Sequence, residues 1–289
     1  RLPIDEEVLW QENGHVREWN QMGRAIAERY DDYDGFVVLH GTDTMAYSAS
    51  ALAFMLENLA KPVIFTGAQI PLGQIRTDGR DNIINSMLIA ASGRVHEVCI
   101  YFNGLLLRGC RSVKRSSDQF EAFAAPNDTP LAFAGIQIQY KRSALRPVPE
   151  GKFRFQPLSE LPIGVVKVFP GIQFAHFASL MTEKLRGVVL ETFGAGNIPG
   201  AAQNALLPII ERAYQNGTII VVCSQCSQGT VSLGTYASSA ALHEVGAVNG
   251  HDMTTEAAFA KLYYLLSRSD DTEWVKSQLG RDLRGELTE

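Results

Sequence analysis

Apolar runs that end in small and polar residues organise the first part of the chain. Residues 36–39, Phe-Val-Val-Leu, are mostly aromatic or β-branched, which predicts a buried strand. Residues 40–44, His-Gly-Thr-Asp-Thr, follow at once, and apolar residues then recur at helical spacing. The residues expected on this one apolar helix face are Leu52, Met55, Leu56 and Leu59. Hydroxyl groups and a carboxylate are therefore expected on a strand-to-helix turn, where open α/β sheets bind their ligands.

The alternation of strand and helix patterns continues along the chain. Strands are predicted over 63–65 and 97–102, an extended segment over 105–107, and a basic loop over 108–114. Helices are predicted over 16–30, with Trp19, Met22, Ile26 and Tyr30 on the apolar face, and over 81–91, with Ile84, Met87, Leu88 and Ala91. This order favours a parallel sheet with helices on both faces and right-handed crossovers.

The pattern changes between residues 135 and 161, where short alternating segments surround Pro147, Pro149 and Gly151. The alternation then resumes, with strands predicted over 164–169, 187–191 and 218–223 and helices over 174–180 and 206–214. Thr254 is expected to cap a last amphipathic helix that carries Phe259, Leu262, Leu265 and Leu266. The predicted fold class is α/β, with two successive α/β domains and mainly parallel sheets. We expect a larger N-terminal domain over 1–140, a linker over 141–160 and a smaller C-terminal domain over 161–289.

The composition narrows the classes of partner. Of the 289 residues, 46% are hydrophobic and 20% charged, and the net charge is −5, which argues against nucleic acid or an anionic membrane surface as partner. No apolar run approaches the roughly 18 residues of a membrane span. The 4 cysteines suit a reducing compartment. Cys223 and Cys226 have C-x-x-C spacing, which is compatible with a redox site, but two thiols after a buried strand favour a structural role.

Two cofactor hypotheses fail on spacing. Gly194-Ala195-Gly196 begins like a dinucleotide fingerprint, but Pro199-Gly200 stands where the helix should open, so the segment predicts a tight turn. No second C-x-x-C or histidine pair completes a zinc site. We expect neither a metal nor an organic cofactor.

Thr42, Asp43 and Lys114 form a candidate catalytic set. A threonine hydroxyl becomes reactive only when another group takes its proton, and a lysine amine can do so directly or through a relay. In a parallel sheet the carboxyl ends of successive strands meet at one edge, so the distance along the chain is no obstacle. From the residues alone a simpler interpretation stays open. Asp43 or Thr44 can cap the following helix, and Lys114 can be a solvated charge beside Arg111 and Arg115.

Several motifs in one order resemble the L-asparaginase family. They are Leu39-His40-Gly41-Thr42-Asp43-Thr44-Met45, Pro62-Val63-Ile64-Phe65-Thr66-Gly67-Ala68-Gln69, Arg76-Thr77-Asp78-Gly79-Arg80, and Arg108 to Lys114 followed by Phe120-Glu121-Ala122-Phe123. The tail Leu283-Arg284-Gly285-Glu286-Leu287-Thr288 is similar to the cytoplasmic type I branch. The resemblance runs from about Trp19 to the C-terminus.

This resemblance implies an activity and a site. The activity is hydrolysis of L-asparagine to L-aspartate and ammonia through a threonine acyl-enzyme, without a cofactor, by a cytoplasmic homodimer or homotetramer whose active sites sit between subunits. Thr42, Asp43 and Lys114 are the matched Thr-Asp-Lys triad. Gly41, Thr42, Asp43 and Ala68 are the implied substrate-binding residues, with Asp43 on the substrate's α-amino group. His40 matches a position with no catalytic role, and we expect it to pack beside the site.

The chain departs from the family near its start. The motif Thr-Gly-Gly-Thr-Ile-Gly, whose second threonine is the usual nucleophile, does not occur. Residues 10–16, Trp-Gln-Glu-Asn-Gly-His-Val, stand near the position of the family's Asp-Ser-Ser segment, which holds the substrate's α-carboxylate. We expect the motif to precede the given residues, because loss of the first strand would expose a sheet edge. The alternatives are an amino-acid-binding relative without catalysis, a glutaminase-asparaginase, or an amidotransferase subunit.

Overall fold

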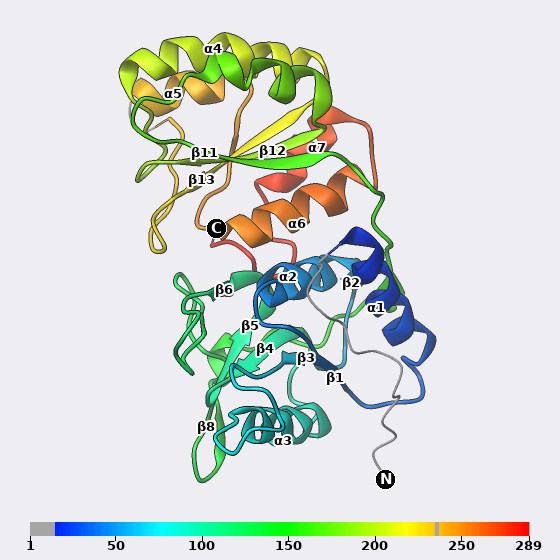
Figure 1. Ribbon diagram of the computed structural model, residues 1–289. Helices are drawn as coiled ribbons and strands as arrows, with labels where there is room; N and C mark the ends of the chain where they lie inside the picture. Colours follow the sequence, from blue (N-terminus) through cyan, green and yellow to red (C-terminus); the bar gives the residue numbers. More distant parts are fainter. Residues whose placement is uncertain (1–14, 235–236, 289) are drawn as a thin grey trace. The chain divides into compact units, whose positions relative to one another are not determined.

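A computed structural model describes residues 15–234 and 237–288 and divides the chain into two compact units, Arg1–Pro157 and Leu158–Glu289 (Figure 1). The first 14 residues, which include the segment around Trp10 that departs from the family motif, lie outside the described residues. None of the helices in the two described ranges has the length and apolar character needed to cross a bilayer.

The first unit is built on a mixed sheet with the strand order β1-β3-β4-β5-β8-β9. β1, β3 and β4 run parallel, whereas β5, β8 and β9 each run antiparallel to the preceding strand in this order. The strands of this sheet are β1 (Phe36–Leu39), β3 (Val63–Thr66), β4 (Val98–Phe102), β5 (Leu105–Arg108), β8 (Ala132–Ala134) and β9 (Ile138–Tyr140). Two short antiparallel pairs join β2 (Leu56–Glu57) to β10 (Arg154–Phe155) and β6 (Val113–Lys114) to β7 (Phe123–Ala124).

Helices cover this sheet on both faces, as the alternating pattern predicted. α2 (Met45–Met55) packs on β4, and α3 (Gly79–Ala91) packs on β1, β3 and β4 from the opposite face (Figure 1). α1 (Val16–Glu28) lies against α2 and buries Trp19, Met22 and Ile26, as predicted. The indole N–H of Trp19 donates to the hydroxyl of Ser48 on α2 at 2.9 Å, which fixes the two helices together.

Several local predictions for this unit were wrong. β1 is only half buried, because among the described strands it lies at the sheet edge and pairs with β3 alone. α2 is buried on nearly all sides and ends at Met55, since Leu56 turns into β2 to pair with Phe155. Residues 108–114 are not a loop. Arg108 ends β5, a 3₁₀ turn follows over Gly109–Arg111, and Lys114 lies on β6.

The predicted apolar face of α3 was also wrong. Ile84 and Leu88 are 52% and 56% exposed, whereas Asn82, Ser86 and Ile89 face the sheet. The buried polar groups are satisfied there: the Ser86 hydroxyl donates to the carbonyl of Asn82 at 2.7 Å, and the Asn82 amide bonds residues outside the helix. Apolar spacing alone therefore chose the wrong side of this helix.

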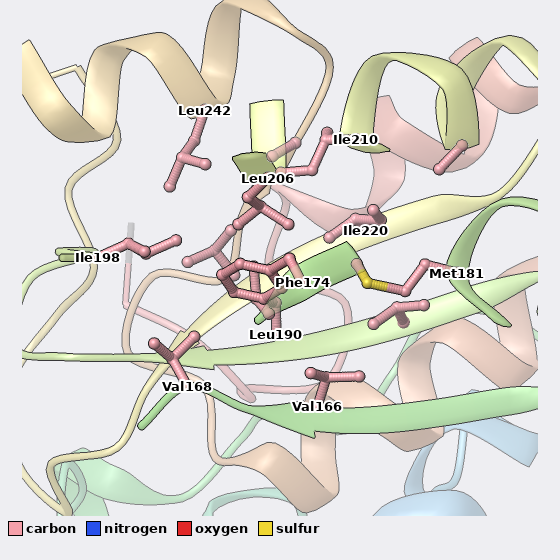
Figure 2. Packing of buried hydrophobic residues seen from close by; sticks show 14 of the residues in the cluster. Val166, Val168, Phe174, Met181, Leu190, Ile198, Leu206, Ile210, Ile220 and Leu242 are labelled. Carbon is pink, nitrogen blue, oxygen red and sulfur yellow. The ribbon is translucent and has the colours of Figure 1, made fainter. Parts of the chain in front are cut away.

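The second unit is built on a parallel sheet with the order β11-β12-β13-β14. Its strands are β11 (Ile163–Lys167), β12 (Gly187–Thr192), β13 (Ile219–Ser224) and β14 (Val248–Asn249). α4 (Gly200–Gln215) and α5 (Ala237–Glu244) lie on one side of the sheet, and α6 (Thr255–Leu266) and α7 (Thr272–Leu279) on the other (Figure 1). Figure 2 shows the core between the sheet and α4, where Leu190 and Ile220 meet Leu206 and Ile210.

The helices of the second unit differ in part from those predicted. The segment 174–180 is not one α-helix but a 3₁₀ turn over Phe174–His176 followed by a π-type turn over Leu180–Lys184. α7 follows the helix expected to be last, and the sequence did not predict α5. The cap of α6 is confirmed, because the Thr254 hydroxyl accepts from the backbone N–H of Ala257 at 3.1 Å.

Candidate active site

Two polar turns lie side by side at the carboxyl ends of β1 and β3. Leu39 is paired with Thr66, and the backbone N–H of His40 donates to the carbonyl of Thr66 at 2.9 Å. A Cβ atom on Gly67 would lie 2.4 Å from the carbonyl oxygen of His40, closer than side-chain carbons approach. Glycine at 67 therefore lets the turn that carries Thr42 and Asp43 approach the turn that carries Ala68.

Lys114 reaches this edge from β6. Its Nζ donates to the Thr42 hydroxyl at 2.8 Å and also forms an ion pair with a carboxylate oxygen of Asp43. The Lys114 side chain is 19% exposed, whereas that of Asp43 is 79% exposed. The sequence-predicted set of Thr42, Asp43 and Lys114 is thus brought together, with the carboxylate at the open side of the group.

The directions of the hydrogen bonds around Thr42 follow from the chemistry of the partners. A lysine ammonium only donates, so the Thr42 oxygen accepts from Lys114 and its proton points to Gln69 Oε1, at 3.3 Å. Gln69 Nε2 in turn donates to the carbonyl of Gln119 at 3.0 Å, which fixes the orientation of the amide. Gln69 is a site contact to which the sequence reasoning assigned no role.

The capping interpretation of this turn was wrong. Thr44 occupies the cap position of α2, but its side chain accepts no hydrogen bond from the helix. Its buried hydroxyl oxygen has no hydrogen-bond partner within the described ranges. The Asp43 carboxylate bonds Lys114 instead. Neither the Thr44 hydroxyl nor the Asp43 carboxylate therefore caps the first turn of α2.

His40 packs behind the turn. Its Nδ1 lies 2.6 Å from the carbonyl oxygen of Gly41, and its ring is tilted against that of Phe65. Burial lowers the pKa of His40, and the hydrogen bond to Gly41 and the negative charge of Glu18 offset this only in part. A neutral imidazole that donates from Nδ1 to Gly41 is the form suited to this place.

The other segments tested for cofactor chemistry do not form such sites. In the described residues no group of three or more histidine, cysteine, aspartate or glutamate side chains is placed to hold a metal ion. Gly194 and Gly196 have positive φ angles inside a turn closed by Phe193 and Asn197, as predicted. Burial raises the pKa of the Cys223 thiol to about 12, which keeps it protonated and disfavours the redox interpretation, while Cys226 is exposed.

Comparisons with known proteins cover nearly the whole chain. A family model described as "Asparaginase, N-terminal" matches residues 11–146, and one described as "Glutaminase/Asparaginase C-terminal domain" matches residues 162–279. The chain is 45% identical over 271 residues to "L-asparaginase 1" of Escherichia coli K12, covering 94% of this chain and 80% of the relative. It is 42% identical to the "60 kDa lysophospholipase" of Mus musculus, of which it covers 48%.

The fold is also similar to that of a solved asparaginase structure. The crystal structure of L-asparaginase I from Vibrio cholerae superimposes with a TM-score of 0.89 at 44% sequence identity. The match covers 95% of this chain and 82% of that chain.

Proposed function

This chain belongs to the asparaginase family, and on that premise we propose that it hydrolyses L-asparagine to L-aspartate and ammonia. The observation that carries the proposal is the contact of Lys114 with both Thr42 and Asp43 at the carboxyl edge of a sheet. An amine, a hydroxyl and a carboxylate in direct contact form a proton relay beside a charged binding group. Ala68, on the neighbouring turn, supplies backbone groups to the same edge.

In the proposed reaction a threonine hydroxyl attacks the side-chain amide carbon of asparagine. In this proposed step Lys114 acts as a neutral amine, so the hydrogen bond between Lys114 and Thr42 runs in the opposite direction. The Thr42 hydroxyl accepts the proton of the attacking threonine and passes its own proton to Lys114 Nζ. The proton now on Lys114 returns through Thr42 to the amide nitrogen, which leaves as ammonia, and an ester remains between threonine and the β-carboxyl group. Water attacks the ester with the same relay as base, and aspartate and the threonine hydroxyl are restored.

Asp43 has a different proposed role. Its carboxylate is largely exposed and already holds an ammonium group, that of Lys114. We propose that it also binds the α-amino group of the substrate, so that one carboxylate links substrate and relay. Gly41 and Thr42 lie on the same turn and complete the proposed binding surface.

The attacking threonine needs its own test, since Thr-Gly-Gly-Thr-Ile-Gly does not occur in residues 1–289. The natural gene product is incubated with L-asparagine, and ammonia and aspartate are measured together, with L-glutamine as a parallel substrate. Equal amounts of both products from asparagine support the proposal. Trapping the ester with hydroxylamine as aspartyl hydroxamate supports the acyl-enzyme. A protein that binds aspartate but releases no ammonia is instead an amino-acid-binding relative.

The assembly and location are proposed with the function. We propose a homodimer or a dimer of dimers in the cytoplasm, as expected from the type I resemblance. Light scattering at micromolar concentration measures the number of subunits, and a fully active monomer would contradict the proposed assembly.

A further inference from the structure

Polar side chains at the start of α3 hold the turn that carries Ala68. Asp78 stands at the cap position of α3, yet its carboxylate makes no cap to that helix. It accepts instead from the backbone N–H of Gln69, at 3.0 and 3.1 Å, and from that of Ile70, at 3.0 Å. Asn82, one turn later and 2% exposed, donates from Nδ2 to the carbonyl of Gly67 at 3.0 Å and to Asp78 at 3.1 Å.

Asn82 is itself anchored, and Thr77 adds further bonds to the turn. Asn82 Oδ1 accepts from the backbone N–H of Asn103, in the turn between β4 and β5, at 3.0 Å. Thr77 accepts from the N–H of Gly79 at 3.0 Å and donates to the carbonyl of Ile70 at 2.7 Å. The turn is therefore fixed by the side chains of Thr77, Asp78 and Asn82, at the start of α3, rather than by its own side chains.

The geometry of the peptide bond then sets the direction of both polar groups of Ala68. In a trans peptide the N–H and the C=O point to opposite sides. Because the carbonyl of Gly67 points to Asn82, the N–H of Ala68 points away from it. Because the N–H of Gln69 points to Asp78, the carbonyl of Ala68 points away as well. Neither group of Ala68 has a hydrogen-bond partner within residues 15–234 and 237–288.

We propose that Asp78 and Asn82 are positioning residues for amide recognition, a role that rests on the proposed function. They turn the N–H and C=O of Ala68 outward as an adjacent donor and acceptor. A primary carboxamide offers the complementary pair, a carbonyl acceptor and an NH₂ donor. An ester offers only acceptors, so the Ala68 carbonyl gains no hydrogen bond from it.

The first test removes the hydrogen bonds and keeps the shape. Asp78→Asn places an amide donor against the donor of Asn82, and Asn82→Asp places a carboxylate against the carbonyl of Gly67. Asp81→Asn and Asn85→Asp make the same chemical changes at other positions of α3, whose side chains make no hydrogen bond to the turn among the described residues. The measured quantity is kcat/KM for L-asparagine relative to that for the β-methyl ester of L-aspartate.

We expect kcat/KM for asparagine to fall roughly 10- to 100-fold in Asp78→Asn and Asn82→Asp, the loss that follows from hydrogen bonds to charged or buried groups. The value for the ester should fall less, so the amide-to-ester ratio drops. The two control variants should keep the wild-type ratio. Circular dichroism and thermal unfolding verify that each variant is folded.

The second test moves Ala68 without removing a hydrogen bond. A Cβ on Gly79 would lie 2.5 Å from Cδ2 of the flexible Leu72 side chain and 2.9 Å from the Cβ of Ala68, whereas a Cβ on Gly73, in the loop before α3, would meet nothing within 4 Å. Gly79→Ala should therefore lower the amide-to-ester ratio, while Gly73→Ala should not. Alanine also favours the first helical turn more than glycine does, so the variant should fold.

The outcomes separate this proposal from the proposed function. A wild-type protein that releases no ammonia contradicts the function. In that case calorimetry still tests the positioning role: wild type should bind asparagine more tightly than the methyl ester, and Asp78→Asn should reduce this preference. Folded variants that keep the wild-type ratio, or that lose amide and ester activity equally, overturn the positioning role. If Asn82→Asp does not fold, Asp78→Asn and Gly79→Ala decide.

Discussion

The ammonium nitrogen of Lys114 lies 2.8 Å from the hydroxyl oxygen of Thr42, across 72 residues of sequence. The two residues come from different elements, the turn after β1 and the short strand β6, and Lys114 also contacts Asp43. This contact gives the proposed relay a geometry that mutation can test.

Lys114→Met should leave the fold intact and lower kcat by roughly 10²- to 10⁴-fold, because the relay loses its proton acceptor while the methionine stem keeps the packing. Aspartate binding should change less, since Asp43 and Ala68 remain. Arg115→Met is the matched control, because Arg115 is exposed and its Nη1 lies 3.9 Å from Glu121. Steady-state kinetics with asparagine decides, and an unchanged kcat removes Lys114 from the mechanism.

Thr42→Val should behave like Lys114→Met, because either change interrupts the same proton path. The double variant should be little worse than either single variant, since residues that act as one unit are not additive. The measurement is a double-mutant cycle on kcat. Losses that multiply would show that Thr42 and Lys114 act independently.

Asp43→Asn should raise KM for asparagine, because the variant loses the charge proposed to bind the α-amino group. A loss of about 10- to 100-fold in kcat/KM is expected for a hydrogen bond to a charged group. Succinamate, which lacks the amino group, is the control substrate and should respond much less. Equal losses for both substrates would assign Asp43 to the relay alone.

Glu286→Gln should strongly lower the free energy of unfolding. The side chains of Lys261 and Glu286 are both 0% exposed and form an ion pair at 2.5 Å, and Glu286 also accepts from the backbone N–H groups of Leu283 and Arg284. The substitution removes the counter-ion of the buried Lys261 ammonium, which keeps its hydrogen bonds to the carbonyl oxygens of Leu279 and Arg281. Breaking a buried ion pair in this way costs about 3–5 kcal/mol. Urea unfolding of wild type and Glu286→Gln measures this difference in the free energy of unfolding. Glu183→Gln, in the exposed pair with Arg212, should cost about 1 kcal/mol or less.

His40 should make the protein less stable in acid. Burial lowers its folded pKa below the ordinary value of 6.5, so below pH 6.5 the unfolded chain binds a proton that the folded protein excludes. The free energy of unfolding should therefore fall as the pH drops from 6.5 toward the folded pKa. His40→Asn should remove this part of the pH dependence, while His176→Asn, at an exposed position, should retain it. Unfolding curves at pH 7.5 and 5.5 test this, and parallel losses in wild type and His40→Asn would contradict it.

Local patterns in the sequence were sufficient to predict several strands and one helix cap. Continuous apolar runs predicted β3 and β4 in the first unit and β12 and β13 in the second, because a strand inside a sheet needs apolar residues on both faces. Similar runs predicted the strands β1 and β11, which are less buried. The cap of α6 could also be predicted, because the hydrogen bond between Thr254 and Ala257 joins residues only three positions apart. The motif around Thr42 and Asp43 also placed the candidate site at the carboxyl end of a strand.

Local spacing did not predict which side chains are satisfied by partners far along the chain. Periodicity chose Ile84 and Leu88 as the buried face of α3, but partners at Gly67, Asp78 and Asn103 satisfy the amide of Asn82 and allow the opposite face to be buried. Likewise Asp43 looked like a cap until Lys114 was placed beside it. The free energy of burying a polar group depends on its partner, and a partner far along the chain is set by the fold rather than by local spacing.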